Sequence, residues 1–217
     1  VFPPHPLRRD TLTMFAKIVQ SCDTKIALTD TSYNHQKQLA SIRERLTTLR
    51  RGTSWPDSLQ WIVTDKKSSS VSAPPTRSSV QRSEIAFLQF TSGSTSDPKG
   101  VMITHGNLAH NLTIITNELQ ASTSTVVVSW LPQYHDMGLI GSYLGVLYCG
   151  GTGYYMSPLS FLQRPMLWME AVSKYKATHL QAPNFAFKLT ARKYKDTKLD
   201  LSSVQHIINA AEPVDAE

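Results

Sequence analysis

The chain has 217 residues, of which 41% are hydrophobic and 18% are charged, and its formal net charge at pH 7 is +6. This length can bury a sizeable core, and the composition excludes collagen-like, mucin-like and wholly disordered chains. A positive balance favours anionic partners, but residues 100–163 contain no Lys or Arg at all. A nucleic-acid surface needs clustered basic residues with aromatics between them, and the sequence has no such cluster. We therefore expect no nucleic-acid partner.

The cysteines and the apolar runs bear on the compartment. Cys22 and Cys149 lie far apart in apolar neighbourhoods, which favours two small buried thiols in a reducing compartment over a disulfide or a metal site. The longest apolar run, residues 138–151, is interrupted by Ser142 and is shorter than the about 20 residues of a membrane helix. No charged-then-apolar leader opens the chain. We expect a cytoplasmic protein with no transmembrane segment and, because the chain starts at Val1 rather than Met, an internal fragment of a longer one.

Residues 1–65 are predicted to form a first α/β segment. Two sets of apolar residues have helical spacing: Leu12, Phe15, Val19 and Cys22, and then Leu39, Ile42, Leu46 and Leu49. Asp10 is a suitable N-cap for the first helix, and Gly52 is expected to stop the second. Residues 26–29 and 59–64 read as short strands.

Residues 66–83 differ in composition from the rest of the chain. Seven of these 18 residues are Ser, Pro74 is followed by Pro75, and no apolar residue is larger than Val. This composition predicts a flexible linker or surface loop that joins two α/β segments.

Residues 84–217 are predicted to form a second α/β segment, because strands and helices alternate along it. The predicted strands are residues 85–90, 125–130, 152–156, 178–181 and 205–209. The predicted helices are one capped by Thr104 that carries Leu108, Leu112, Ile115 and Leu119, and then residues 138–149, 165–175 and 185–194. A loop over residues 91–100 is expected after the first of these strands. The alternation predicts an α/β fold with mostly parallel sheets flanked by helices.

The predicted loop 91–100 reads Thr-Ser-Gly-Ser-Thr-Ser-Asp-Pro-Lys-Gly. Glycines let the backbone approach an anion closely, successive N–H groups can cradle phosphate oxygens, and Lys99 adds a positive charge. It is not a Walker loop, because Pro98 precedes the lysine. Ser, Gly, Asp and Pro are also ordinary turn residues. The residues alone leave a phosphate loop and a polar surface turn both open.

A second distinctive segment is residues 130–141, Trp-Leu-Pro-Gln-Tyr-His-Asp-Met-Gly-Leu-Ile-Gly. His135 beside Asp136 could be a metal pair, but no third ligand is evident nearby in the sequence. A Ser-nucleophile mechanism lacks its Gly-x-Ser-x-Gly turn. Taken alone, His135 is best interpreted as a structural histidine.

Both segments resemble the adenylate-forming superfamily of acyl-CoA synthetases, luciferases and peptide-synthetase adenylation domains. Its signature loop usually reads Thr-Ser-Gly-Ser-Thr-Gly-x-Pro-Lys-Gly, and Val-Met-Ile-Thr-His-Gly-Asn-Leu at 101–108 also looks like that family. The string 134–141 resembles the fatty acyl-AMP ligase branch. Residues 156–168, 182–186 and 209–213 resemble later segments in the same order, so the resemblance covers nearly the whole chain and implies part of the large N-terminal domain. Ser96 and Ala210 depart from it, since the family usually has glycine at both positions.

The resemblance implies a reaction and a set of site residues. A fatty carboxylate would attack the α-phosphate of ATP with Mg²⁺, and the acyl group would then pass to a phosphopantetheine thiol of an acyl carrier protein or of coenzyme A. His135 and Lys99 would act at the reacting groups. The phosphates would be held by Thr91, Ser92, Gly93, Ser94, Thr95 and Gly100. The adenine would be lined by Asn209, Ala210, Ala211 and Glu212.

Further expectations follow from the same resemblance. Residues 138–147 and 183–187 would line an apolar acyl tunnel. The family's Mg²⁺-holding glutamate, its ribose-binding aspartate and its catalytic C-terminal lysine have no counterpart here, so no residue of this chain is assigned to metal and the chain alone is expected to be inactive. An acyl-CoA synthetase and a non-catalytic acyl- or nucleotide-binding homologue are the alternatives, the latter favoured by Ser96 and Ala210.

One cluster of Lys and Arg residues has no role in these assignments. It comprises Lys188, Arg192, Lys193, Lys195 and Lys198. We expect it to cover a solvated helix face and turn, with a docking patch for an acidic carrier protein as the alternative.

Overall fold

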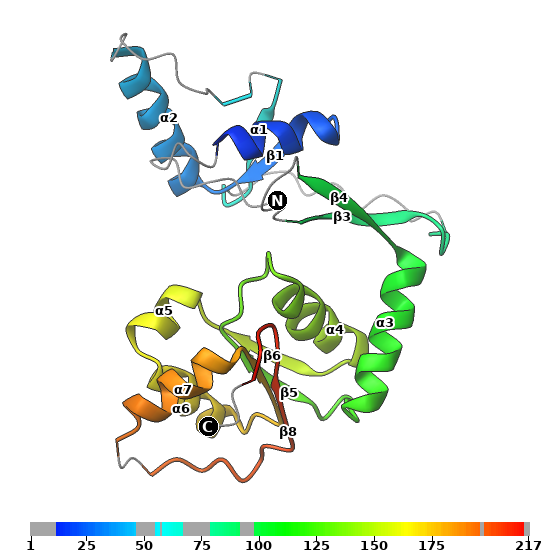
Figure 1. The fold of residues 1–217 in the computed structure, drawn as a ribbon, viewed down its shortest axis with the longest axis vertical. Coiled ribbons are helices and arrows are strands. Elements are labelled where there is room, and N and C mark those ends of the chain that lie inside the picture. Colours follow the sequence, from blue (N-terminus) through cyan, green and yellow to red (C-terminus); the bar gives the residue numbers. More distant parts are fainter. Residues whose placement is uncertain are drawn as a thin grey trace. The chain divides into compact units, whose positions relative to one another are not determined.

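A computed structural model describes residues 12–46, 55–56, 58–66, 79–91, 98–195 and 198–214. Its contacts divide the chain into two compact units, residues 1–106 and residues 107–217, and each unit is described by itself (Figure 1). Among the helices that fall within the described ranges, none combines the length and the apolar character needed to cross a bilayer.

The first unit begins with a helix–strand–helix–strand order. It contains α1 (Leu12–Ser21), β1 (Ile26–Thr29), α2 (Thr31–Leu46) and β2 (Gln60–Val63). The two strands are parallel, with Ile26 opposite Gln60. The predicted helical spacing of α1 is confirmed, because Phe15 and Val19 are buried together with Leu59. The predicted stop of the second helix at Gly52 lies outside the described residues.

The end of β2 is joined to the beginning of α2 by side-chain hydrogen bonds. The Asp65 carboxylate accepts hydrogen bonds from the backbone N–H of Thr31 and from its hydroxyl. The Asp30 carboxylate accepts one from the N–H of Tyr33, which lies in the first turn of the helix. Acidic side chains satisfy the free N–H groups at a helix start, so Asp30 and Asp65 fix where α2 begins.

The last part of the first unit is an antiparallel hairpin of β3 (Ile85–Thr91) and β4 (Lys99–Thr104). The expectation of a loop throughout residues 91–100 was wrong at both ends, since Thr91 belongs to β3 and Lys99 and Gly100 belong to β4. Lys99 to Thr104 contains the β-branched and apolar run Val-Met-Ile-Thr, which suits a strand. The predicted segment 84–217 therefore contributes its first strands to the unit of residues 1–106.

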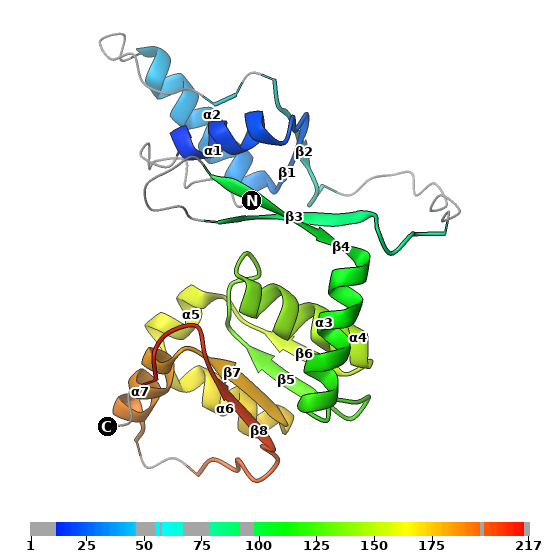
Figure 2. The same cartoon turned by 45° about the vertical axis from the view of Figure 1, so that its right-hand side comes forward.

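The second unit is built on a parallel four-stranded sheet in the order β6-β5-β7-β8. Its strands are β5 (Val126–Ser129), β6 (Thr152–Tyr155), β7 (His179–Ala182) and β8 (His206–Asn209). Helix α3 (His105–Glu118), the π-helix η2 (Met137–Leu144) and α4 (Gly145–Cys149) lie between the hairpin and β6 in the chain, and α5 (Pro158–Gln163), α6 (Met166–Tyr175) and α7 (Asn184–Lys193) follow. The parallel strands and flanking helices confirm the predicted fold class (Figure 2).

Alternate residues of the sheet face two different helix layers. Val127, His179 and Gln181 line a small cavity together with residues of α3, η2 and α4. Val128, Leu180 and Ala182 belong to a core cluster with residues of α5, α6 and α7. Because side chains of a strand alternate between its faces, one layer of helices covers each face.

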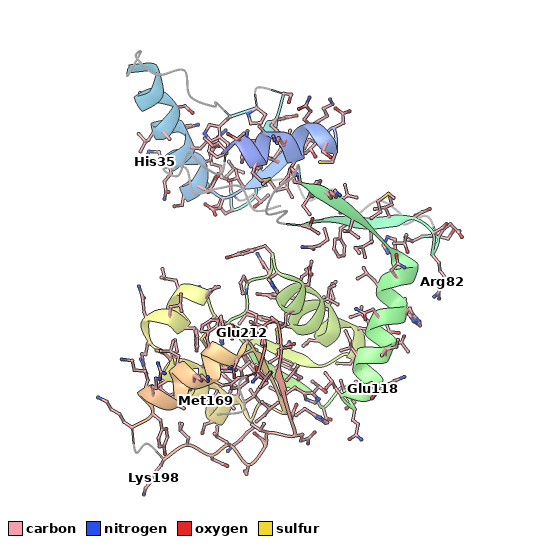
Figure 3. All side chains as sticks on the ribbon, in the orientation of Figure 1. His35, Arg82, Glu118, Met169, Lys198 and Glu212 are labelled. Atoms are coloured by element: carbon pink, nitrogen blue, oxygen red, sulfur yellow. The ribbon has the colours of Figure 1, made fainter. Side chains whose placement is uncertain are left out.

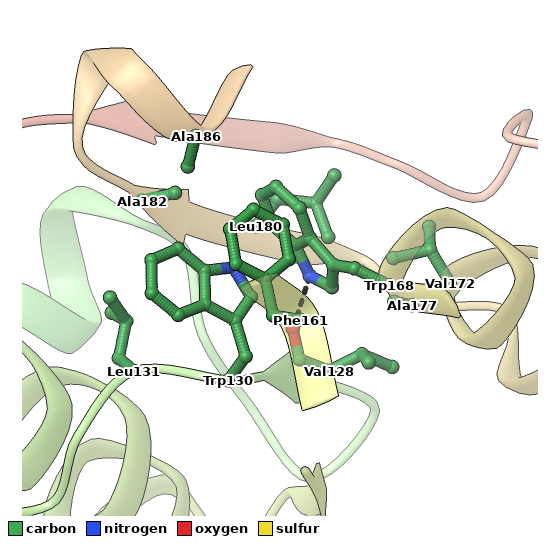
Figure 4. Packing of buried hydrophobic residues seen from close by; sticks show 10 residues of the cluster. All are labelled: Val128, Trp130, Leu131, Phe161, Trp168, Val172, Ala177, Leu180, Ala182 and Ala186. Carbon is green, nitrogen blue, oxygen red and sulfur yellow. Dashed lines mark hydrogen bonds between the residues drawn. The ribbon is translucent and has the colours of Figure 1, made fainter. Parts of the chain in front are cut away.

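The core beneath α5, α6 and α7 is rich in aromatic residues (Figure 4). Phe161 and Trp168 are fully buried, and the ring of Trp130 stacks on Phe161 with a centroid distance of 4.0 Å. The indole N–H of Trp168 donates a 2.9 Å hydrogen bond to the carbonyl of Val128. A buried indole needs such a partner, and this one attaches α6 to the central strand β5.

Helix α5 is the one helix of this unit for which the sequence reading gave no expectation. Its signals are local: Pro158 occupies the first turn, and the hydroxyl of Ser157 accepts a hydrogen bond from the N–H of Ser160. Both are ordinary features of a helix start. Six residues were too few to show a helical period.

Candidate active site

Three loops of the second unit leave the sheet at the same edge. The loop after β5 carries Trp130 to Asp136, β7 is followed by Pro183, and β8 is followed by Ala210. The strands are parallel, with Ala182 opposite Asn209 in the register. The carboxyl ends of parallel strands meet at one edge, which is where open α/β sheets bind ligands. The structure thus gathers His135 and the segment 209–212 at the expected kind of edge.

His135 lies in a tight turn between β5 and η2. Its N–H donates to the carbonyl of Pro132 at 3.1 Å, and its own carbonyl accepts from the N–H of Leu139 at 2.8 Å. The imidazole is exposed, and its Nδ1 accepts a hydrogen bond from the N–H of Met137 at 3.3 Å. Because Nδ1 is the acceptor, Nε2 carries the proton of the neutral ring. The turn therefore presents an N–H donor to the solvent side of the edge.

Gly138 allows this turn to pack closely against the beginning of η2. A Cβ on Gly138 would overlap the carbonyl oxygen of Pro132, and Gly138 is buried. Any side chain at this position would push the turn that holds His135 away from the helix.

A buried polar chain supports the same loop from below. The amide of Gln181 donates to the hydroxyl of Ser142 at 2.5 Å, and Ser142 donates to the hydroxyl of Ser129 at 3.0 Å. The Ser129 hydroxyl accepts from the N–H of Leu131 at 3.1 Å. We call Ser129, Ser142 and Gln181 the polar brace. It links β7, η2 and β5 to the backbone that leads into His135.

The polar brace was missed by sequence reasoning, although one signal pointed to it. Ser142 is the one serine in the longest apolar run, which has no threonine, and the structure buries it completely. A buried hydroxyl is expected to have hydrogen-bond partners. The identity of those partners required the fold.

The segment after β8 is attached to the start of α7. The side-chain amide of Asn209 donates to the side-chain carbonyl of Asn184 at 3.1 Å. The carboxylate of Glu212, which is labelled in Figure 3, accepts a 2.6 Å hydrogen bond from the N–H of Phe185 in the first turn of α7. A carboxylate at a helix N-terminus satisfies a free N–H group and complements the helix dipole. Glu212 thus has a structural role in this unit in addition to its predicted place beside the adenine.

The backbone of the same segment is unusual at Ala211 rather than at Ala210. Ala211 has a φ of 75°, in the left-handed region that favours glycine. Ala210 instead donates its N–H to the carbonyl of Ala182 at 3.3 Å. Ala210, where the family usually has glycine, therefore continues the contact with β7, and the strained backbone is at Ala211.

Two polar atoms at this edge are buried without a partner in the part of the chain that the structure describes. They are the side-chain oxygen of Asn209 and the indole nitrogen of Trp130. An unsatisfied buried group is costly and indicates a missing partner. The oxygen of Asn209 is a hydrogen-bond acceptor at a position predicted to line adenine.

The predicted phosphate loop belongs to the first unit. Thr91 and Lys99 are opposite each other at the end of the β3–β4 hairpin, and both are exposed. Gly100 lies against the ring of Phe90, where a Cβ would come within 2.9 Å of the ring. Ser92, Gly93, Ser94, Thr95 and Ser96 lie outside the described residues.

The predicted acyl tunnel involves residues on both faces of the second unit's sheet. Gly141, Gly145 and Val146 line an apolar cavity of about 40 Å³ with Ile115 and Gln181. Ala186 is instead buried in the core beneath α5, α6 and α7, with Phe187 packed against it. The cavity therefore has walls from residues 138–147, while residues 183–187 contribute to the opposite layer.

No group of three or more His, Cys, Asp or Glu side chains that could hold a metal ion occurs among the residues that the structure describes.

These observations describe an α/β unit with a candidate ligand-binding edge, and comparison with known proteins gives its class. A family model described as AMP-binding enzyme matches residues 10–217. The chain belongs to this family of AMP-binding enzymes.

Particular relatives are similar over different shares of the chain. A medium-chain-fatty-acid–[acyl-carrier-protein] ligase of Moorena producens is 36% identical over 99% of this chain and 36% of its own length. A ligase with the same description from Teredinibacter turnerae is 45% identical over 63% of this chain and 22% of its own length. The present chain thus spans about a third or less of these curated relatives.

A solved structure supports the fold over the whole chain. The crystal structure of a fatty acyl-adenylate ligase from L. pneumophila, in complex with acyl adenylate and pyrophosphate, matches with a TM-score of 0.79 and 35% identity. The match covers 100% of this chain and 36% of that chain. The chain therefore has the fold of part of an adenylate-forming enzyme.

Proposed function

We propose that the full-length protein activates a fatty acid with ATP, forms fatty acyl-AMP and pyrophosphate, and transfers the acyl group to a phosphopantetheine thiol of an acyl carrier protein. The observation that carries the proposal is that β5, β7 and β8 are parallel, so that the loop with His135, the start of α7 at Asn184 and the segment 209–212 all follow carboxyl ends of strands of one sheet. The relatives named above are carrier-protein ligases, which favours a carrier over coenzyme A as the acceptor.

The reaction requires two anions, a carboxylate and a triphosphate, to approach each other. Charge that develops on their oxygens is stabilised by donors that are already in position. His135 has its Nδ1 occupied by the N–H of Met137, so its Nε2–H is the available donor. We assign His135 to orienting the carboxylate and stabilising its charge, without nucleophilic attack.

The nucleotide is assigned to two sets of residues. The phosphates are proposed to be held by Thr91, Lys99 and Gly100, together with residues 92–95. Asn209, Ala210 and Ala211 are proposed to line the adenine, with Glu212 holding this segment against α7. The unpaired buried oxygen of Asn209 fits this role, because the exocyclic amino group of adenine is a hydrogen-bond donor.

Mg²⁺ is proposed as the second cofactor, and it would neutralise charge on the phosphate oxygens of ATP when bound. We propose the cytoplasm as the compartment, since Cys22 and Cys149 are free, partly buried thiols.

The test measures fatty-acid-dependent exchange of pyrophosphate into ATP by the full-length protein. We expect exchange with a medium-chain fatty acid and a loss of about 100-fold in kcat/KM for His135→Ala, since a positioned donor is worth about that much. Gln133→Ala, an exposed change in the same turn, is the control and should keep the wild-type rate. Absence of exchange in the wild type, or equal rates for both variants, contradicts the proposal.

A further inference from the structure

The positive charge of the second unit is confined to one stretch of the chain. All eight Lys and Arg residues of positions 107–217 lie within positions 164–198, and this stretch contains only two acidic residues, Glu170 and Asp196. These basic residues come from α6, α7 and the segments next to them. The opposite helix layer, α3, η2 and α4, has no Lys or Arg. The sheet therefore separates a helix layer that carries Lys and Arg, that of α6 and α7, from the layer of α3, η2 and α4, which has neither.

Helix α7 carries this charge on its outer side. Ala186 and Thr190 are buried against the sheet. Lys188 and Arg192 are one turn apart, and with 3.6 residues per turn they point away from that buried side. Phe185 lies one turn before Lys188 on the same side and is exposed by 45%. We call Phe185, Lys188 and Arg192 the α7 stripe.

The α7 stripe begins at the candidate active site. The N–H of Phe185 is held by Glu212, and the side chain of Asn184 is held by Asn209. The helix has ten residues, so its basic end lies about 15 Å from these contacts. A partner that lies along α7 would thus have one end beside the adenine-lining segment.

Several of these basic residues also have local roles. Arg192 and Lys193 in the last turn complement the dipole of α7. Lys176 pairs with Asp200, and Arg164 pairs with Glu170. Lys174 and Lys198 are exposed outside α7 and increase the positive field of the same layer. Helix α7 itself contains no acidic residue.

We propose that the α7 stripe, with the basic residues around it, is the docking surface for the acidic helical face of the acyl carrier protein. The inference rests on the proposed function, because the carrier is the acceptor assigned there. Charge complementarity selects an acidic partner and speeds its encounter, and Phe185 supplies an aromatic contact of the kind enriched in interface cores. Docking along α7 places the thiol arm of the carrier at the edge that holds the acyl adenylate.

The test uses the full-length protein and separates the two half-reactions. Lys188→Glu/Arg192→Glu should raise the KM for the phosphopantetheine-bearing carrier about tenfold, with fatty-acid-dependent pyrophosphate exchange within about twofold of wild type. Lys188→Gln/Arg192→Gln, which keeps α7 free of new acidic groups, should raise this KM about threefold. Raising NaCl from about 50 mM to about 300 mM should raise the KM for the carrier more in the wild type than in Lys188→Glu/Arg192→Glu.

The matched control is Lys66→Glu/Arg82→Glu, which changes the net charge by the same amount at two exposed positions of the first unit. It should leave the KM for the carrier unchanged. If the α7 variants and the wild type have equal KM values for the carrier, the docking proposal is wrong. The proposed function still stands in that case, provided that the wild type exchanges pyrophosphate into ATP. Loss of binding to phosphatidylserine vesicles with an unchanged carrier KM also overturns it, since the surface would then serve a membrane. A wild type without pyrophosphate exchange refutes the proposed function instead.

Discussion

The two faces of the second unit's sheet are built in different ways. Beneath α5, α6 and α7 the sheet meets a dense aromatic core, in which Phe161 and Trp168 have no exposed surface. Beneath α3, η2 and α4 it meets glycines, the polar brace and a small cavity. A closely packed core resists a change of shape. The comparison indicates that aromatic packing fixes one face of the sheet, while hydrogen bonds among polar side chains hold the other.

The strongest test of this difference is removal of Trp168. Trp168→Ala should lower the free energy of unfolding by about 3–5 kcal/mol, because it leaves a cavity in the core and removes the hydrogen bond to the carbonyl of Val128. Chemical denaturation of the full-length protein measures the change. Trp168→Phe is the control that loses the hydrogen bond but keeps most of the volume, and it should cost less. A loss of under about 1 kcal/mol for Trp168→Ala would show that the aromatic face is not the rigid one.

On the glycine-rich face, the polar brace is the part that should be sensitive. Ser142→Ala leaves the amide of Gln181 and the hydroxyl of Ser129 without their shared partner. We expect a loss of about 1–3 kcal/mol in the free energy of unfolding, together with a raised KM for the fatty acid. Ser83→Ala, at an exposed position before β3, should change neither quantity. A neutral Ser142→Ala would mean that the brace does not hold the His135 loop.

The same face should respond to acid through His179. Burial, opposed in part by its hydrogen bond to the carbonyl of Leu119, lowers the pKa of His179 below its usual value, and the nearby His206 lowers it further. The unfolded chain then binds more protons, so stability is full above about pH 6.5 and is lost as the pH falls below it. Thermal unfolding of the full-length protein from about pH 8 to about pH 5 measures the slope.

The control for this pH dependence is a pair of histidine variants. His179→Asn should flatten the fall in stability between neutral and acidic pH. His110→Asn, at an exposed position of α3, should keep it. An identical slope in the two variants would assign the acid sensitivity to another group.

The smallest expected effect on stability is at Ala211, in the segment after β8. Ala211 has a φ of 75°, which costs an L-residue about 1 kcal/mol that glycine does not lose. Ala211→Gly should therefore stabilise the full-length protein by up to about 1 kcal/mol. Ala210→Gly, where the backbone is not left-handed, should destabilise it slightly. The reverse order would show that the strained position is misassigned.

The sequence was informative where a hydrophobic pattern and a local signal coincide. The run Thr-Val-Val-Val-Ser-Trp at 125–130 predicted β5, and the fold class followed from the alternation of such strands with helices. It was uninformative where polar residues occur in a regular element. The hydroxyl and glycine residues of 91–100 favoured a loop, but Thr91, Lys99 and Gly100 belong to the antiparallel pair of β3 and β4.

The candidate site was predictable in its position but not in its internal contacts. His135 and residues 209–212 follow strands, so their meeting at one edge is a property of parallel sheets. The contacts of Asn184 with Asn209 and of Glu212 with Phe185 join residues about 25 positions apart. Such contacts depend on how α7 packs on the sheet, and no short-range pattern contains them.

The π-helix η2 has a consequence for how this protein can diverge. Its closing hydrogen bond runs from the N–H of Gly145 to the carbonyl of Ile140, five residues back. Removing one residue from η2 would restore ordinary helical bonding and rotate the residues before or after the deletion by about 100°. A single-residue deletion in η2 would thus change which side chains face the cavity, while the sequences of β5 and of the turn that holds His135 stay the same.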